Sequence, residues 1–251
     1  MLKQIVKDRE KLLVGNELSD VHCHLDMFKD PFVIAKDALF GGVSIIITAG
    51  GSEASSLSAV KMADGDNVFA VIGIDPQNAA NDAGFVDQLP GIIKSNRRVV
   101  GIGEIGLDYS MGIDREIQVG VFERQIEIAK SLDVPIVVHS RKAISEVAEL
   151  VKAHGVKKAV FHFFEGDENM ASDLADLGYL ISIPPIESSR RKRVINKLSI
   201  DSIVVETDSP AVGKSPLDVI KVVELVSEIK GIPFNETSMR ITHNVKKLFS
   251  I

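Results

Sequence analysis

The sequence predicts an α/β protein in which eight parallel strands close into a single (β/α)8 TIM barrel. Three observations lead to this prediction: β-branched runs alternate with helical patterns from residue 18 onward, the strand candidates number eight, and several runs are almost continuously hydrophobic. Parallel strands that are covered by helices on both faces have this last character. The length of 251 residues also matches the roughly 250 residues that one such barrel needs.

The strand candidates are short and follow one another along the whole chain. They are Leu18–Cys23, Val43–Thr48, Val68–Ile74, Val99–Ile105, Ile136–Val138, Ala159–Phe163, Leu180–Ile183 and Ile203–Val205. Because a helical or turn segment follows each of them, a closed barrel explains the count better than an open doubly wound sheet. In such a barrel the carboxyl ends of all strands meet at one rim, which is the catalytic face.

Helical periodicity is clearest between the fourth and fifth strand candidates, over Arg115–Leu132. Apolar residues recur there every three or four positions, which places them on one side of a helix. That stripe comprises Val119, Phe122, Ile126 and Ala129. Further helices are expected at Ile144–Ala153, Ser188–Leu198 and Leu217–Ile229.

The chain is expected to form one domain over residues 1–251. No linker rich in Pro, Gly or Ser divides it, and no repeat of 20 to 50 residues is evident. Residues 1–17 precede the first strand and predict a short amphipathic helix that packs outside the barrel or across its bottom. We assign this N-terminal extension no chemistry.

Composition excludes several classes of protein. A net charge of −6, from 29 basic and 35 acidic residues, disfavours a tight passive binder of DNA or RNA, because such binding depends on neutralising phosphates. The absence of Trp and the presence of only 2 Tyr disfavour a platform on which bases stack. Both features remain compatible with an enzyme that meets a nucleic acid end only briefly.

The sequence also predicts a cytoplasmic protein without a membrane span. A single cysteine cannot form an internal disulfide, so nothing indicates an oxidising compartment. The apolar runs are far shorter than the roughly 18 residues that suggest a membrane span, and the charged N-terminus lacks the apolar stretch of a signal peptide. The oligomeric state is left open.

Histidines and acidic residues fall at the ends of the strand candidates. His22 and His24 end the first strand two residues apart, so they are expected to project together into the barrel while Cys23 faces the surrounding helices. The ends of later strands carry Glu104, His139, His162 and Asp208. Four histidines and two carboxylates are too many for one tetrahedral site, and they suit two divalent ions that share a bridging carboxylate.

The remaining histidines lie outside this pattern. His154 ends a helix just before Gly155, where a surface imidazole is expected, and His243 lies in the last helix beyond the eighth strand. We expect neither to take part in the chemistry.

Six motifs make the sequence resemble the TatD-like metal-dependent hydrolases, whose founding members are deoxyribonucleases. They are SDVHCHLD (19–26), GEIGLDY (103–109), IVVHSRKA (136–143), FHFFEG (161–166), VVETDSP (204–210) and THNVKKLF (242–249). The resemblance implies a barrel of the metal-dependent hydrolase type. It also implies that one ion is held by His22, His24 and Asp208, that Glu104 bridges, and that a second ion is held by His139 and His162.

The sequence departs from the family pattern in two loops. The family usually has HCFSG or HCFTG after the sixth strand, where this chain has His162-Phe163-Phe164-Glu165-Gly166. The strand that usually ends in Ser-Gly ends here in Ile183-Pro184-Pro185. Because both loops shape the substrate pocket, the departures concern the substrate and leave the predicted ligands in place.

Catalytic roles are predicted for two of these carboxylates. Asp208 is expected to act as metal ligand and general base, and Glu104 as bridging ligand. Weaker predictions concern residues near the rim: Glu206 in orienting ligands or in a structural role, Asp108 as a turn cap, and Asp20 in orienting a histidine or closing the strand. Substrate contacts are predicted for Arg141, Tyr109, Arg190 and Arg191. The alternative is an ion pair with the following helix for Arg141 and a solvated helix face for Arg190 and Arg191.

The leading hypothesis is a hydrolase with two divalent ions, Zn²⁺, Mn²⁺ or Mg²⁺, that acts on phosphodiester bonds. The expected activity is a 3′ to 5′ exodeoxyribonuclease on single-stranded DNA ends, which makes nucleic acid a transient partner. The alternative is an ester or amide hydrolase, such as a D-aminoacyl-tRNA deacylase or a small-molecule amidohydrolase, because two ions polarise a carbonyl as readily as a phosphoryl group. A non-enzymatic barrel predicts damaged ligands, and all six positions carry competent ones.

Overall fold

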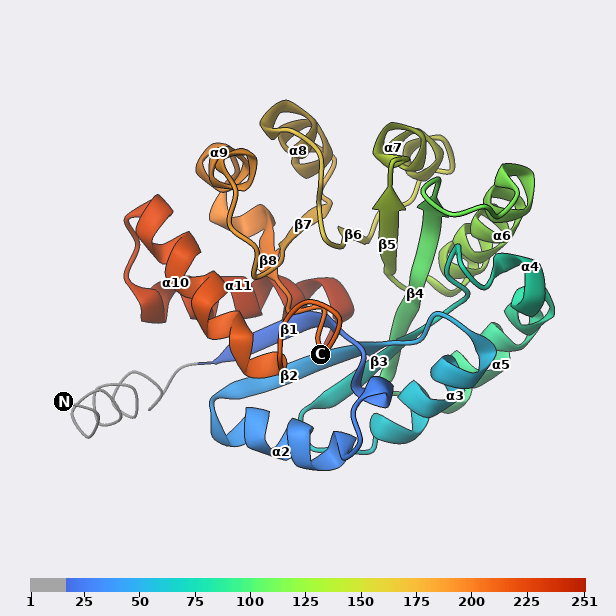
Figure 1. Ribbon diagram of the computed structural model, residues 1–251, viewed down its shortest axis with the longest axis horizontal. Coiled ribbons are helices and arrows are strands. Elements are labelled where there is room, and N and C mark those ends of the chain that lie inside the picture. The colour runs from blue at the N-terminus through green and yellow to red at the C-terminus, as the bar shows by residue number, and fades with distance from the viewer. Residues whose placement is uncertain (1–16) are drawn as a thin grey trace.

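Eight parallel strands form one sheet in sequential order in the computed structural model, which describes residues 17–251 (Figure 1). The strands are β1 (Leu18–Cys23), β2 (Val43–Ala49), β3 (Val68–Ile72), β4 (Val99–Asp108), β5 (Ile136–Arg141), β6 (Ala159–Phe161), β7 (Leu180–Ile183) and β8 (Ile203–Val205). Helices surround them as an outer ring, so the predicted (β/α)8 barrel is confirmed.

The first and last strands meet through backbone hydrogen bonds just beyond their carboxyl ends. The amide of Asp208 donates to the carbonyl of His22 at 2.9 Å, and the amide of His24 donates to the carbonyl of Ser209 at 2.8 Å. The buried carboxylate of Asp20 accepts hydrogen bonds from the amide and the hydroxyl of Thr207. Asp20 therefore links β1 to the segment that follows β8.

The helices follow the strands in the expected alternation. They are α2 (Pro31–Phe40), α3 (Glu53–Met62), α4 (Ala79–Asp82), α5 (Leu89–Ser95), α6 (Arg115–Leu132), α7 (Ile144–Ala153), α8 (Glu168–Asp176), α9 (Ser189–Lys197), α10 (Val219–Lys230) and α11 (Phe234–Phe249), with 3-10 turns η1 (Leu25–Met27), η2 (Ala83–Gln88), η3 (Ile200–Ser202) and η4 (Pro216–Asp218).

Helix α6 has the predicted bounds because an aspartate at each end stops it there. The Asp114 side chain accepts hydrogen bonds from the first free amides of the helix, and Asp133 ends it in the left-handed conformation. Phe122, Ile126 and Ala129 of the predicted stripe are buried. Helix α10 starts two residues later than expected, because Pro216–Asp218 first form the 3-10 turn η4.

Two layers of apolar side chains hold the barrel together. The inner layer includes Val71, Val137 and Val160 from successive strands, together with Val245 and Phe249 of α11. Helix α11 therefore packs against the inner apolar layer, and its Asn244 donates hydrogen bonds to the carbonyls of Ile200 in η3 and of Ile203 at the start of β8. The outer layer joins strands to helices and contains Cys23, which confirms that this thiol faces away from the barrel centre.

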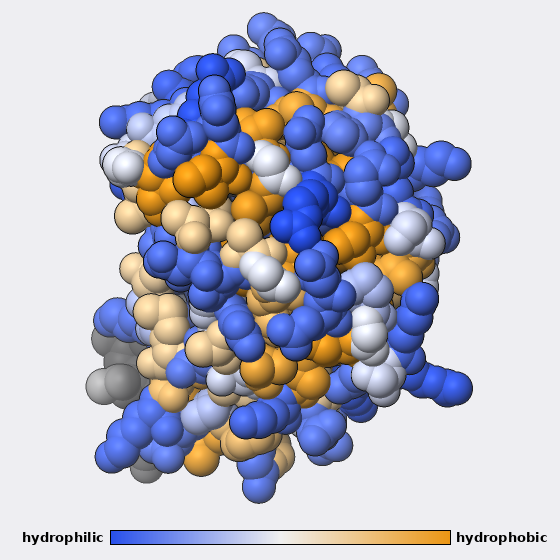
Figure 2. Space-filling view, turned by 90° about the vertical axis from the view of Figure 1, so that its right-hand side faces the viewer, coloured by the Kyte–Doolittle hydropathy of each residue, from blue (hydrophilic) through white to orange (hydrophobic). Residues whose placement is uncertain are grey.

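The predicted N-terminal extension lies outside the described residues, apart from Glu17. Within residues 17–251, none of the helices combines the length and the apolar character that crossing a membrane requires. The surface on the side of α4, α5 and α6 is mainly hydrophilic, with apolar residues in patches between the charged ones (Figure 2).

Candidate metal centre

A cavity of about 550 Å³ lies at the carboxyl ends of the strands. Five of the six predicted ligands line it, and the sixth, His22, is fully buried beneath them. The lining residues are His24, Asp26, Met27, Gly51, Ser55, Asp75, Gln77, Asn78, Glu104, His139, Ser140, Arg141, His162, Phe163, Glu165, Asp208, Ala211 and Val212. The predicted ligands thus converge at the rim that the fold reserves for catalysis.

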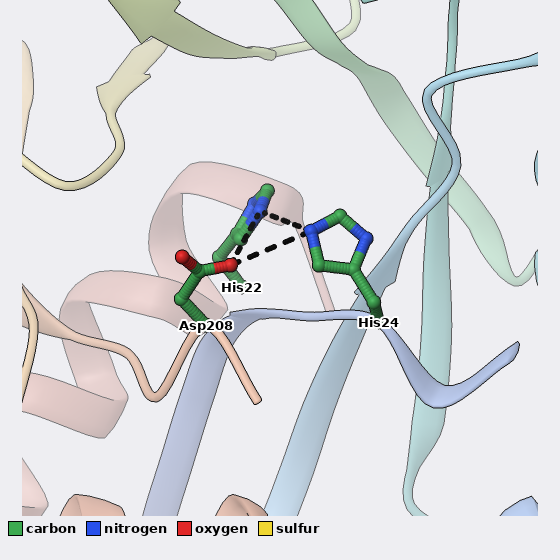
Figure 3. Close-up of side chains that lie close together, drawn as sticks. All are labelled: His22, His24 and Asp208. Atoms are coloured by element: carbon green, nitrogen blue, oxygen red, sulfur yellow. Dashed lines mark hydrogen bonds and ion pairs between the residues drawn. The ribbon is translucent and has the colours of Figure 1, made fainter. Parts of the chain in front are cut away.

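Three side chains point toward one another where β1 meets the loop after β8 (Figure 3). The Nε2 atoms of His22 and His24 are 3.3 Å apart, and the Oδ1 atom of Asp208 lies 3.9 Å from the first and 3.4 Å from the second. Asp208 reaches this position because its backbone adopts a positive φ of 47°, which is uncommon for residues other than glycine but tolerated by Asp. The three atoms are close enough to hold one cation.

Glu104 lies between two groups of histidines. Its Oε2 atom is 3.5 Å from His22 Nε2 and 3.6 Å from His24 Nε2. Its Oε1 atom is 2.6 Å from His139 Nδ1 and 3.3 Å from His162 Nε2. One carboxylate oxygen therefore faces the β1 histidines and the other faces the histidines of β5 and β6, as a bridging carboxylate requires.

The second group that is close enough to hold a cation comprises His22, Glu104 and His162. It differs from the set that the resemblance implies, in which His139 accompanies His162. His139 contacts Glu104 but belongs to neither group.

Acidic side chains lie behind His139 of β5 and behind His162, which follows β6. Glu206 is fully buried, and its Oε2 atom is 3.2 Å from His162 Nδ1, while its Oε1 atom accepts a hydrogen bond from the amide of Phe163 at 2.8 Å. The Oδ2 atom of Asp108 lies 3.6 Å from His139 Nε2. On the β1 side, His24 Nδ1 instead faces the backbone carbonyl of Ala49 at 3.2 Å.

Attraction between the carboxylates and the histidines shifts the pKa values of both kinds of group at this site. Burial opposes ionisation of Glu104, yet the neighbouring His162 and His22 lower its pKa well below the usual range. Burial likewise disfavours a charged His24, but the contact with Asp208 and the charge of Glu104 raise its pKa to about 9. The carboxylates are therefore ionised at neutral pH and attract positive charge into the cavity.

The donor set fits divalent cations. His22 and His24 aim nitrogen atoms at each other and at a carboxylate oxygen, an arrangement that a shared cation satisfies better than the single proton that can lie between two imidazoles. Four imidazoles and two carboxylates suit Zn²⁺ or Mn²⁺, whereas Mg²⁺ prefers sites made of oxygen atoms.

Comparison with known proteins agrees with this geometry. A family model described as TatD related DNase matches residues 19–250. The chain belongs to the TatD-related DNase family. Human deoxyribonuclease TATDN3 is 30% identical over 261 aligned residues, which cover 94% of this chain and 95% of that protein. YabD of Bacillus subtilis, named an uncharacterized metal-dependent hydrolase, is 29% identical and covers 93% of this chain and 99% of its own.

A solved structure of the TatD family shares the fold. The crystal structure of YJJV, a TatD homologue from Escherichia coli K12, superimposes with a TM-score of 0.86 at 26% identity, covering 93% of this chain and 98% of that one. Membership of the TatD-related DNase family makes this protein a metal-dependent hydrolase, and its candidate metal centre occupies the catalytic rim of the barrel.

The structure separates the predicted substrate contacts of this TatD-family chain into two sets. Arg141 lines the cavity, and within residues 17–251 it is the only Arg or Lys that does so. Tyr109 lies outside the lining, where its hydroxyl donates to Glu146 and accepts from Arg115. Arg190 and Arg191 are also outside it.

Arg190 and Arg191 instead support the loop after β6. Arg190 donates to the carbonyl of Glu165 at 3.0 Å, and the guanidinium of Arg191 lies 5.6 Å from the ring centroid of Phe163. Because Phe163 and Glu165 both line the cavity, these arginines hold part of its wall from behind.

Asp75 is one of the cavity residues that the sequence did not predict. It follows β3 and carries no motif of its own, so the only available signal was its position directly after the hydrophobic run VFAVIGI. Its neighbours Ser55, Gln77 and Asn78 also line the cavity and were missed for the same reason. His154 and His243 lie outside the lining, as expected.

Proposed function

We propose that this protein is a hydrolase that uses two divalent cations to cut phosphodiester bonds, as a 3′ to 5′ exodeoxyribonuclease on single-stranded DNA. The position of Glu104 carries the proposal, because its two oxygens face separate groups of histidines. Relatives named deoxyribonucleases support the choice of nucleic acid as substrate.

We assign one cation to His22, His24 and Asp208 and the second to His139 and His162, with Glu104 shared. When bound, divalent cations supply Lewis acidity, which makes hydroxide available near neutral pH and polarises the phosphoryl oxygen. The ligand side chains keep these positions because His24 and His162 are each fixed at their second ring nitrogen.

Asp208 is the proposed general base. Its Oδ1 atom faces the histidines, and its side chain is partly exposed to the cavity. It accepts a proton from the attacking water while the new bond from oxygen to phosphorus forms and the bond to the leaving oxygen breaks. Arg141 is placed to pair with the phosphate through its forked donors.

The first test measures nuclease activity against metal content. Purified protein loaded with Mn²⁺ or Zn²⁺ should shorten a single-stranded oligonucleotide from its 3′ end, and a chelator should abolish the reaction. Asp208→Asn should lower kcat by about 10³-fold, as expected for loss of a general base. His243→Gln, which changes an exposed histidine of α11, is the matched control and should leave activity unchanged. Full activity in the chelated protein would contradict the proposal.

One observation favours a second candidate, hydrolysis of an ester that carries an amino group, as in a D-aminoacyl-tRNA. Beyond the proposed ligands, the cavity is lined by Asp26, Asp75 and Glu165, with Arg141 as the single basic residue among those described. Acidic walls attract an ammonium group and repel extra phosphates. Turnover of oligonucleotide and D-aminoacyl-tRNA side by side distinguishes the two candidates.

A further inference from the structure

A second polar surface of the cavity lies beside the metal centre, on the loops after β2 and β3. It consists of Ser55, Asp75, Gln77 and Asn78, and we call it the polar wall. Strand β4, which carries Glu104, separates the end of β3 from the end of β5, which carries Arg141. Asp75 and Arg141 therefore flank Glu104 on its two sides.

The carboxylate of Asp75 is held firmly from the loop side. Its Oδ1 atom accepts two hydrogen bonds from Asn78, one from the backbone amide and one from the side-chain Nδ2, both at 2.9 Å. Asn78 also donates to the carbonyl of Gly51 at 3.1 Å, and the amide of Asp75 donates to the same carbonyl at 2.8 Å. These contacts fix the position of the carboxylate without using its second oxygen.

The second oxygen, Oδ2, accepts no hydrogen bond from the side chains and amides of residues 17–251. Gly51 makes room for it, because a Cβ atom at that position would lie 2.3 Å from Oδ2. A larger residue at position 51 would displace the carboxylate from the cavity wall.

Asp75 also has no cationic partner within the described part of the chain. Burial, reinforced by the negative charge of Glu104, raises its pKa to about 6. A half-buried carboxylate of this kind repels a phosphate group and favours a ligand that donates a hydrogen bond. The part of the substrate that lies over the polar wall is therefore a donor and not a phosphate.

The cationic side chain of Arg141 on one side of the metal centre and the free carboxylate oxygen of Asp75 on the other match one phosphate followed by a sugar that bears no further phosphate. A sugar without a further phosphate occurs only at the end of a nucleic acid chain. Building on the proposed nuclease function, we propose that Asp75 selects chain ends by accepting a hydrogen bond from the free hydroxyl of the terminal sugar.

Asp75→Asn gives a sharp test because the neighbouring hydrogen bonds orient the new amide. Its oxygen takes the place of Oδ1, since Asn78 donates two hydrogen bonds there, and its NH₂ group takes the place of Oδ2. The variant therefore keeps the shape and the loop contacts, and replaces the free acceptor by a donor. A purely structural role of Asp75 survives this change, whereas recognition of a hydroxyl does not.

The experiment compares kcat/KM for single-stranded oligonucleotides of one sequence that end in a 3′-hydroxyl, a 3′-hydrogen or a 3′-phosphate, each with a 5′-hydroxyl or a 5′-phosphate. Wild-type enzyme should prefer the hydroxyl over the phosphate at the 3′ end by about 10- to 100-fold, the range of a hydrogen bond to a charged group. Asp75→Asn should reduce that ratio to within about threefold, with the metal content unchanged. Asp173→Asn on the outer helix α8 is the control and should keep the wild-type ratio.

Each other outcome overturns the inference in a recognisable way. Cleavage whose end preference is the same in wild-type and Asp75→Asn enzyme overturns it and leaves the proposed nuclease function intact. Loss of a metal ion from the variant makes Asp75 a ligand instead. If Asp75→Asn loses activity only on an aminoacyl ester with a free amino group, Asp75 is the partner of an ammonium ion. Absence of cleavage by the wild-type enzyme rejects the nuclease function and this inference with it.

Discussion

The histidines on the two sides of Glu104 have the same chemical role in our proposal but different surroundings. On the β5–β6 side, carboxylates lie behind the rings, with Glu206 3.2 Å from His162 Nδ1 and Asp108 3.6 Å from His139 Nε2. On the β1 side, a backbone carbonyl faces His24 Nδ1, and His22 Nδ1 is buried without a hydrogen-bond partner. The β5–β6 histidines are therefore supported by charged carboxylates, and His24 on the β1 side is supported by a backbone carbonyl.

This difference indicates which contacts give the histidines on each side of Glu104 their affinity for a cation. A carboxylate behind a histidine fixes the ring orientation and makes the ligand more basic, and its loss costs about 10- to 100-fold in metal affinity. The β1 side lacks that help, but Asp208 contacts both of its histidines directly. We therefore expect substitutions behind the rings to separate the two sides, and substitution of the shared carboxylate to affect both.

The largest effect is expected for Glu104→Gln. The amide carries no negative charge, so both cations lose their shared ligand, and activity should fall by at least about 10³-fold. Calorimetric titration with Mn²⁺ should show that both binding events weaken. If one of the two Mn²⁺ binding events kept its affinity, Glu104 would bind only one cation and the two sides would be independent.

Glu206→Gln should affect one side only. The buried Glu206 accepts hydrogen bonds from the amide of Phe163 and the hydroxyl of Ser182 and contacts His162. Within residues 17–251, no hydrogen bond or ion pair links it to the β1 histidines. One Mn²⁺ binding event should weaken by about 10- to 100-fold, while the other keeps its affinity.

Asp20→Asn provides the matched control for that titration. Asp20 is also a buried carboxylate near the rim, but it accepts hydrogen bonds from Thr207 and the amide of His22 and supports no imidazole ring. It should lower the melting temperature and leave both affinities in place. Equal weakening of both events in Glu206→Gln would contradict the division into two sides.

Asp108→Asn should give a smaller change in the same direction. The distance to His139 is 3.6 Å, beyond ordinary hydrogen-bond length, and the other oxygen of Asp108 is already engaged by Ser110. We expect Mn²⁺ affinity at the β5–β6 side to fall by about tenfold. Ser110→Ala keeps the carboxylate and serves as control. If Asp108→Asn lost more Mn²⁺ affinity than Glu206→Gln, Asp108 would be the stronger of the two supporting carboxylates.

The sequence predicted the strands well because most of them are buried on both faces and carry a strong local signal. The main differences lie at the carboxyl ends. Strands β3 and β6 end two residues earlier than expected, at Ile72 and Phe161, whereas β4 continues to Asp108 and β5 to Arg141. These extensions pair with each other, from Gly106 with His139 to Asp108 with Arg141. Such pairing depends on a neighbouring strand that is distant in sequence, so local patterns do not reveal it.

The candidate site was predictable to the level of the strand ends. The position of His22, His24, Glu104, His139 and Asp208 at the rim follows from strand order alone. The contacts behind them do not, because His162 and Glu206, which follow β6 and β8, are 44 residues apart in sequence. Arg190 and Arg191 failed to reach the cavity because the loop after β6 lies between them and the opening.

The smallest predicted effect concerns a histidine that, like His139, lies between two carboxylates, but on the surface. His154 Nδ1 is 2.7 Å from Glu127 and its Nε2 is 3.2 Å from Glu123. The hydrogen bond to Glu127 contributes most to raising the pKa of His154 above its ordinary value. Since the folded-state pKa is raised, the stabilisation is complete below the unfolded value of about 6.5 and is lost as pH rises through the folded value.

His154→Gln should therefore lower the melting temperature by no more than about 2 °C at acidic pH, the size expected for an exposed ion pair, and by nothing at about pH 9. Thermal unfolding of both proteins across this pH range measures the difference. Mn²⁺ affinity should be unchanged, because His154 lies outside the cavity lining. A difference that grows with pH would show that the neutral imidazole is the stabilising form of His154 and would contradict the prediction.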